Sequence, residues 1–310
     1  MRQGEQAVLT RRNFVAGDLF RGGVGILEVY MEHKKIDLRR LGGTAETLLF
    51  PLYFRAVENQ RPDPIVRDEK AADLVRELDY DFSKARRIGF DQVLALMRMR
   101  EFDGRVRSFL EGHPAGCVVE IGCGLDTRFW RVDNGAGEWY ELDLPEVMAV
   151  RAQLLPEEPR RRLIGCSALD FSWMNLLPNR PGEAIFFVAE GVFPYFKEPE
   201  VRELVVALKA RFPGSELVFD ALSPFMVWMG NLILTRAKTS ARVQWGLRDD
   251  RDPEAWDPDL HLLRAWYYYD KPEPRLGFFQ AMKWVRPFNR AARVLLYGLG
   301  GSNPENTALG

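Results

Sequence analysis

The fold is decided by the stretch CVVEIGCGLDTR, residues 117–128. Its first five residues are mostly apolar and β-branched, which predicts a buried strand at 117–121. The strand stops at Gly122 and Gly124, and glycines at such a turn let a ligand approach the backbone. A nicotinamide dinucleotide site favours GxGxxG, but Thr127 stands at the third glycine position. The stretch therefore favours S-adenosylmethionine, a nucleoside with a charged amino-acid moiety in place of a pyrophosphate; a purely structural glycine turn is the alternative.

Strands and helices alternate on the C-terminal side of this turn. Further strands are predicted at 138–142, 162–166, 184–189 and 216–220, and helices at 145–155 and 198–211. Helices are also predicted before the turn, at 44–59, 68–78 and 88–110. Strand, helix, strand repetition indicates an α/β fold with a parallel sheet and right-handed crossovers. The apolar runs at 278–285 and 293–297 are ambiguous in type and could return to the sheet edge.

Composition limits the class of protein. The length of 310 residues allows one large α/β domain with decorations, or two domains. The content of 46% hydrophobic and 28% charged residues excludes a wholly disordered chain. A net charge of −1 gives no basic footprint for nucleic acid, and no apolar run approaches the roughly 18 residues of a membrane span. We therefore expect a soluble protein without nucleic-acid or membrane partners. Residues 1–43, rich in glycine and charge, are predicted to be a flexible arm, and the aromatic-rich residues 223–275 a cap.

Cysteines and histidines give no sign of a metal or redox site. None of the cysteine spacings is CxxC, and the histidines lie far apart in sequence. We expect reduced cysteines, a cytoplasmic protein, surface histidines and no metal. The residues concerned are Cys117, Cys123, Cys166, His33, His113 and His261.

A carboxylate follows the glycine turn at a useful distance. Asp143 comes at the end of the next predicted strand, 19 residues after Gly124. At that position an acid accepts hydrogen bonds from both hydroxyls of a ribose. The alternative is that Asp143 only caps the helix that begins near Pro145.

Two strings, GCGLDTR at 122–128 and LDLPEV at 142–147, resemble the leucine carboxyl methyltransferase family. The resemblance extends over about residues 40 to 300. It implies a Rossmann-like class I methyltransferase with a seven-stranded, mostly parallel sheet. The helical N-terminal extension would span 44–112, the cofactor-binding core 113–222, and the return to the sheet with the C-terminal tail 276–310. The bacterial branch of the family includes polyketide O-methyltransferases of the tetracenomycin type.

The resemblance also implies a set of contacts to S-adenosylmethionine. Arg98, in an Arg-x-Arg-x-x-Asp stretch with Arg100 as competitor, would pair with the cofactor carboxylate. The family often has Asp-Leu after the third strand, where this chain has Ser167-Ala168, so Asp170 becomes the candidate for the adenine amine. The expected cofactor contacts are Arg98, Glu120, Gly122, Cys123, Gly124, Asp143, Leu144, Ser167, Ala168, Asp170 and Glu190.

The acceptor side is assigned to Arg55, Tyr195 and Trp245, with Arg55 orienting a carboxylate. Methyl transfer from a sulfonium is an in-line displacement and needs positioning rather than a nucleophile. A carboxylate acceptor is ionised at neutral pH, whereas a phenol needs a base. Three hypotheses stay open: methylation of a small carboxylic or phenolic metabolite, methylation of a protein C-terminus, and a nonenzymatic adenosyl-ligand binder.

Overall fold

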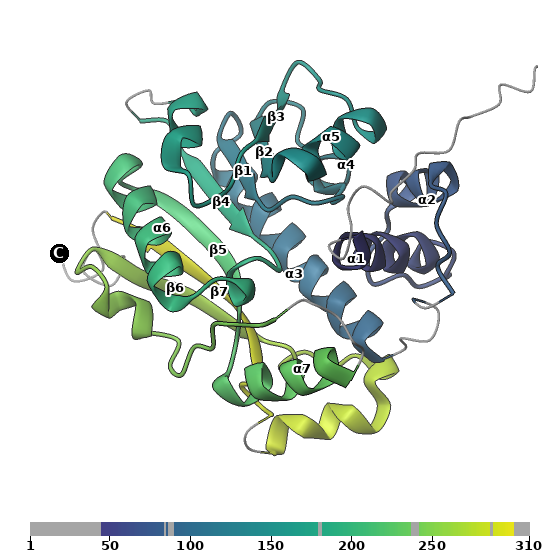
Figure 1. Cartoon of the computed structure of the whole chain (residues 1–310). Coiled ribbons are helices and arrows are strands. Elements are labelled where there is room, and N and C mark those ends of the chain that lie inside the picture. The colour runs from purple at the N-terminus through teal and green to yellow at the C-terminus, as the bar shows by residue number, and fades with distance from the viewer. Residues whose placement is uncertain are drawn as a thin grey trace, which may run out of the picture. The chain divides into compact units, whose positions relative to one another are not determined.

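A seven-stranded mixed sheet is the centre of the described chain (Figure 1). The computed structural model describes residues 45–83, 85, 90–178, 182–236, 242–285 and 288–300, which belong to a unit spanning Lys35–Gly310. The strand order is β3-β2-β1-β4-β5-β7-β6. The predicted arm at 1–43 lies outside the described residues.

The first five strands run parallel, so their carboxyl ends meet at one edge of the sheet. Every residue of β1 and of β4 is buried, as expected for strands covered on both faces. The predicted parallel strands and the α/β class are confirmed. The parallel strands are β1 (Cys117–Ile121), β2 (Glu138–Asp143), β3 (Arg161–Gly165), β4 (Ile185–Ala189) and β5 (Ser215–Leu222).

The far side of the sheet differs from the sequence-based expectation. Residues assigned to the cap form β6 (Leu260–Tyr267), which pairs antiparallel with β7 (Ala292–Leu299). A register shift between Leu262 and Arg264 interrupts the two-residue alternation that would have revealed the strand. The ambiguous run at 293–297 does return to the sheet, within β7, whereas most of 278–285 lies in η6 (Pro274–Trp284).

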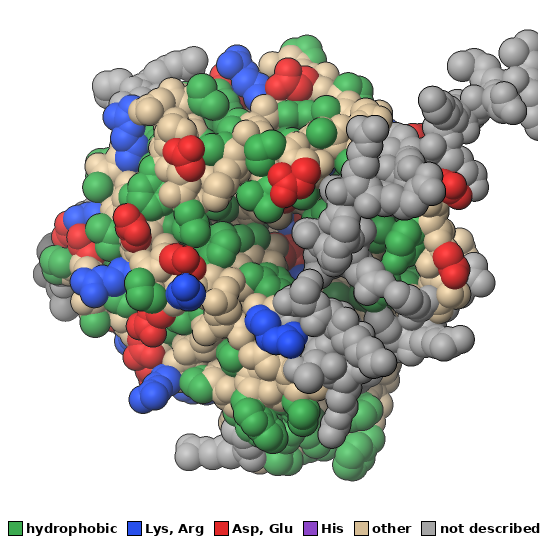
Figure 2. Space-filling view, viewed as in Figure 1, with side chains coloured by type: hydrophobic (Ala, Val, Ile, Leu, Met, Phe, Trp, Pro, Cys, Tyr) green, Lys and Arg blue, Asp and Glu red, His purple; other side chains and the backbone are tan. Residues whose placement is uncertain are grey.

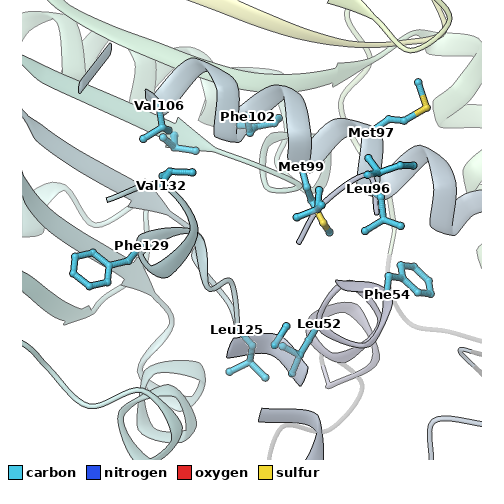
Figure 3. Close-up of a cluster of buried hydrophobic side chains, with 14 of the residues drawn as sticks. Leu52, Phe54, Leu96, Met97, Met99, Phe102, Val106, Leu125, Phe129 and Val132 are labelled. Atoms are coloured by element: carbon cyan, nitrogen blue, oxygen red, sulfur yellow. The ribbon is translucent and has the colours of Figure 1, made fainter. Parts of the chain in front are cut away.

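Helices cover both faces of the sheet. Alternate residues of β1 point to opposite sides: Val118 joins a core with the N-terminal helices, and Val119 joins a core with α6. Figure 3 shows part of the first core, in which α3 packs with Leu52 and Phe54 of α1 and with Leu125. The helices are α1 (Ala45–Glu58), α2 (Glu69–Glu77), α3 (Phe90–Gly112), α4 (Arg128–Val132), α5 (Pro145–Leu154), α6 (Glu198–Arg211) and α7 (Pro224–Arg236). Shorter turns are η3 (Phe171–Leu176), η4 (Phe193–Tyr195) and η5 (Asp252–Ala255).

Candidate cofactor site

The glycine turn follows β1 at the edge where the parallel strands end. Gly122 has φ +69° and Gly124 φ +51°, a region that favours glycine. A Cβ atom at Gly122 would overlap the Val192 side chain, and one at Gly124 would lie 2.8 Å from Leu48 Cδ2. Both positions therefore require glycine, because the neighbouring loop and α1 pack directly on the turn.

Asp143 binds this turn from the end of β2. Its Oδ2 accepts a hydrogen bond from Gly124 N and its Oδ1 from Leu144 N, each at 2.7 Å. The carboxylate does not cap α5, whose N-cap position is Leu144 without a side-chain bond. A carboxylate has about four acceptor positions, so two remain open to a diol. Burial raises the pKa of Asp143, while the two backbone bonds oppose that shift.

Arg98 reaches the same edge from α3. Its Nε donates to Glu190 Oε1 at 2.9 Å and its Nη1 to Asp220 Oδ2 at 3.0 Å. The guanidinium lies 3.4 Å from the position of a Cβ on Gly191, so the backbone there passes close to it. The competitor Arg100 instead lies 3.9 Å from Glu273. The structure thus brings Arg98, and not Arg100, to Glu190 at the strand ends.

Two residues around Arg98 were missed by the sequence analysis. Asp220, near the end of β5, also accepts from Gly191 N at 2.6 Å and so fixes both the guanidinium and the loop after β4. Tyr268 is buried beside Arg98, and burial raises the pKa of its phenol. An acid at the end of the apolar string LVFD was the available signal for Asp220. Tyr268 gave none, since its neighbours are also tyrosines.

A buried charge network lies behind the turn. Arg128 is paired with Glu120, Asp103, Asp126 and Glu190. Glu120 is buried against Arg128, which corrects its assignment as a cofactor contact. Glu120 binds Arg128, and Arg128 in turn binds Glu190. Burial raises the pKa of Glu120 to about 7, against the opposing effect of Arg128.

Arg55 also differs from expectation, and the Cys123 thiol lies away from the solvent. Arg55 is buried, donating from Nε to Asp68 at 2.9 Å and from Nη2 to the Leu125 carbonyl at 2.8 Å. It therefore ties α1 to the turn rather than orienting an acceptor carboxylate. The Cys123 thiol is buried 3.7 Å from Met148 Sδ, so Cys123 contributes to the turn through its backbone.

The segment after β3 offers a carboxylate that also caps η3, together with uncharged polar groups. Asp170 Oδ1 accepts from Ser172 N at 3.1 Å and caps η3, which leaves further acceptor positions on this exposed carboxylate, so its contact with the adenine amine stays a prediction. Ser167 Oγ accepts from Leu169 N at 3.3 Å, and the Ala168 carbonyl accepts from Trp173 Nε1. Ser167 and Ala168 therefore remain at the strand-end edge as partly exposed, uncharged positions.

The two aromatic acceptor candidates separate. Tyr195, in η4, is partly exposed. Its pKa is raised, chiefly by burial and also by the Asp220 carboxylate, against the opposing effect of the Arg98 guanidinium. Trp245 is buried in the second core with Phe193, Phe219 and Trp256. Trp245 is a packing residue, which corrects its assignment to the acceptor side, whereas the acceptor role of Tyr195 stays a prediction.

The described residues contain no group of His, Cys, Asp or Glu side chains that could hold a metal ion. His33 lies outside them. Among the helices that the structure describes, none is long and apolar enough to cross a membrane. The site is thus an edge with a carboxylate and a guanidinium on either side of a glycine turn, which suits a ribose at one end and an amino-acid carboxylate at the other.

Solved structures share this fold at low identity. A protein from Thermobifida fusca has a TM-score of 0.52 at 16% identity, with 81% of this chain and 94% of that chain covered. One from Streptomyces avermitilis has a TM-score of 0.53 at 13% identity, covering 83% and 99%. Both show the fold alone.

Sequence relatives are more specific. The tetracenomycin polyketide synthesis O-methyltransferase of Streptomyces glaucescens is 34% identical over 235 residues, 75% of this chain and 86% of the relative. An S-adenosyl-L-methionine-dependent methyltransferase of Gibberella zeae is 29% identical over 243 residues, 71% and 80% of the two chains. The family model for leucine carboxyl methyltransferase matches residues 49–209. The chain therefore belongs to the leucine carboxyl methyltransferase family and is an S-adenosylmethionine-dependent methyltransferase.

Proposed function

We propose that this protein methylates an oxygen atom of a small, apolar and aromatic acceptor of polyketide type. The observation that carries the proposal is the pair of recognition groups, Asp143 and Arg98, on either side of the glycine turn. The oxygen and the polyketide class are supported by the relative from Streptomyces glaucescens.

The residues present fit the cofactor. Asp143 keeps acceptor positions for the ribose hydroxyls, and Arg98 has five N–H donors, some of which are used by Glu190, Asp220 and Tyr268. The remaining donors suit a carboxylate, because two parallel N–H bonds fix its orientation. When bound, S-adenosylmethionine supplies a methyl group on a sulfonium.

The chain's own contribution to transfer is to hold the acceptor in line and to exclude water. Tyr195 lies near Arg98 and Asp220 and presents a partly exposed ring at the edge. The apolar helix α7 begins two residues after β5, next to the same edge. An aromatic ring and an apolar helix beside the cofactor edge favour a flat, lipophilic acceptor.

Direct displacement is the proposed mechanism, without a covalent enzyme intermediate. The Cys123 thiol is buried, and burial raises its pKa, so it stays protonated and is a poor nucleophile. We expect Cys123→Ala to retain most of its turnover, measured with labelled cofactor. Capture of a methylated cysteine at this position would contradict direct displacement.

The cofactor assignment is tested by calorimetry with S-adenosylmethionine, its demethylated product and NAD. We expect both adenosyl ligands to bind and NAD not to. Asp143→Ala should weaken adenosyl binding at least about tenfold, since charge-assisted hydrogen bonds contribute about 1.5–3 kcal/mol each. Asp259→Ala is the matched control and should leave the affinity unchanged, because this exposed carboxylate precedes the amino end of β6, at the opposite edge of the sheet.

The acceptor class is tested by labelled methyl transfer to a panel of aromatic phenols, aromatic acids and C-terminal peptides. We expect transfer to an aromatic small molecule. Base-labile release of the methyl group identifies an ester, and base-stable product an ether. Transfer to peptides alone would contradict the proposed acceptor while leaving the cofactor assignment intact.

A further inference from the structure

Helix α7 and the segment η6 expose large apolar side chains next to each other. Trp228 is 65% exposed, Phe278 81% and Trp284 76%. The Phe225 ring of α7 contacts the Phe288 ring, which follows η6 along the chain, edge to face with centroids 5.2 Å apart. Figure 2 shows hydrophobic side chains gathered at the lower edge, over α7 and η6 of Figure 1. This apolar face is defined by Trp228, Leu232, Phe278, Phe279, Trp284 and Val285.

The packing of α7 is unusual for so apolar a helix. From Pro224 to Leu232 its side chains are all partly or largely exposed. A helix that is apolar nearly all round is normally buried in a core or in lipid. Exposed apolar patches of this kind mark a contact surface.

The exposed charges beside the apolar rings of η6 are basic. In residues 274–293, the exposed charged residues that the structure describes are Lys283 and Arg290, and this stretch contains no Asp or Glu. Two other arginines of the stretch are already paired within the molecule, Arg275 with Glu58 and Glu273, and Arg293 with Asp250. Lys283 is exposed, with Nζ 4.5 Å from the centroid of the Trp284 ring. Aromatic and basic side chains are thus mixed on one surface.

This combination distinguishes between partners. In a symmetric dimer the same patch would meet itself, so the exposed Lys283 and Arg290 would face the same two cations of the other copy. An anionic lipid surface instead attracts each nearby Lys or Arg by about 1 kcal/mol. Trp and Phe side chains enter the boundary between headgroups and acyl chains.

We propose that the apolar face docks on an anionic lipid surface without spanning it. The proposal goes beyond the methyl-transfer function and revises the expectation of no membrane partner, which rested on the absence of an apolar run long enough to span. Because α7 starts directly after β5, docking would bring the acceptor side of the sheet edge close to lipid.

The test is co-sedimentation of the full chain with vesicles. Vesicles of phosphatidylcholine mixed with phosphatidylglycerol should bind the protein, pure phosphatidylcholine should bind it much less, and added salt should weaken the binding. The double variant Phe278→Ser with Trp284→Ser should reduce binding at least about tenfold, because two large side chains leave the lipid boundary. Lys283→Glu should reduce it less.

Matched controls lie elsewhere on the surface. Leu176→Ser on η3 removes a side chain that is 60% exposed, and Arg202→Glu on α6 reverses an exposed charge. Both should leave vesicle binding unchanged. Thermal unfolding should show that every variant is folded, since all the changes are at exposed positions.

Three results would overturn the proposal. The first is no binding to anionic vesicles. The second is an equal loss of binding in the control variants, which would make the interaction nonspecific. The third is a dimer in the absence of lipid, measured by light scattering, that dissociates in the Phe278→Ser and Trp284→Ser double variant while vesicle binding stays unchanged. The apolar face would then be an interface between two copies of the chain.

Discussion

Two regions next to the carboxyl end of β5 are built in opposite ways. Behind the glycine turn, charged side chains are buried and paired, with Arg128 in contact with four carboxylates. On the apolar face, by contrast, large hydrophobic side chains are exposed to a large extent. The buried charges fix positions inside the molecule, whereas most of the surface of these rings points outward. The comparison indicates that the region of the glycine turn is preorganised to bind a ligand, whereas the apolar face is suited to contact with a lipid surface or another molecule.

The charge network also connects distant parts of the sequence. Arg131 binds Asp68, which is paired with Arg55 of α1, and it binds Asp103 of α3. Arg128 continues from Asp103 to Glu190. Replacing such buried pairs with apolar side chains is often neutral for stability, so their value lies in holding one arrangement. Here that arrangement orients Glu190 toward Arg98.

Breaking this network should have the largest effect. Arg128→Met leaves several buried carboxylates without their shared partner, and we expect a loss of about 3–5 kcal/mol in the free energy of unfolding. Urea unfolding measures the change. The control Arg202→Met removes an exposed arginine and should stay within about 0.5 kcal/mol. A loss of less than about 1 kcal/mol for Arg128→Met would contradict the role of the network.

Acid should weaken the same region. Arg128 and Arg131 hold the pKa of Asp126 well below its ordinary value, and Arg131 lowers that of Asp103, although burial opposes both shifts. The unfolded carboxyls titrate near pH 3.9, so in acid the unfolded chain binds more protons than the native one. Their stabilisation is complete above about pH 4 to 5 and is lost as pH falls through the folded pKa values.

Asp126→Asn should therefore be less stable at neutral pH and lose less on acidification than the unmodified chain. Each unit by which folding lowers the pKa corresponds to about 1.4 kcal/mol. Unfolding free energies between pH 7 and pH 3 measure the two slopes. Parallel curves would show that Asp126 makes no such contribution.

Arg98→Lys should affect binding more than stability. Lysine keeps the charge but loses the planar fork that pairs with a carboxylate, so we expect cofactor affinity to fall about tenfold, or about 1.4 kcal/mol. Arg100→Lys, two residues away on α3, is the matched control and should bind normally. Calorimetry distinguishes them; equal affinities for both variants would place the cofactor carboxylate elsewhere.

The sequence predicted the half of the fold in which local pattern and topology agree. Buried parallel strands read as apolar runs, and the glycine turn marks where the first one ends. Strand β6 was missed because its bulge breaks the two-residue period and most of its residues are only partly buried. Pattern analysis detects a strand from its alternation, which an irregular strand at the sheet edge does not keep.

The site was predicted in the same uneven way. Spacing from the glycine turn led to Asp143 and the family resemblance led to Arg98, and the structure brings both side chains to the edge where the parallel strands end; their contacts with the cofactor stay a prediction. Glu120 and Arg55 were misassigned because the sequence around a charged residue near a binding motif does not show whether its side chain faces the ligand or is buried beneath the turn. Only long-range contacts, such as Arg55 with the Leu125 carbonyl, distinguish the two.

The smallest expected effect sharpens the comparison on the apolar side. Trp228→Ala removes a side chain that is 65% exposed and whose ring lies 6.1 Å from that of Phe225, and we expect the free energy of unfolding to change by less than about 0.5 kcal/mol. Trp245→Ala, with a ring that is 3% exposed among Phe193, Phe219 and Trp256, should cost about 3–5 kcal/mol. Urea unfolding of the two variants compares the same Trp→Ala substitution at an exposed and at a buried position. A large loss for Trp228→Ala would mean that α7 is stabilised by packing of this ring, and the face could not then be free for an external contact.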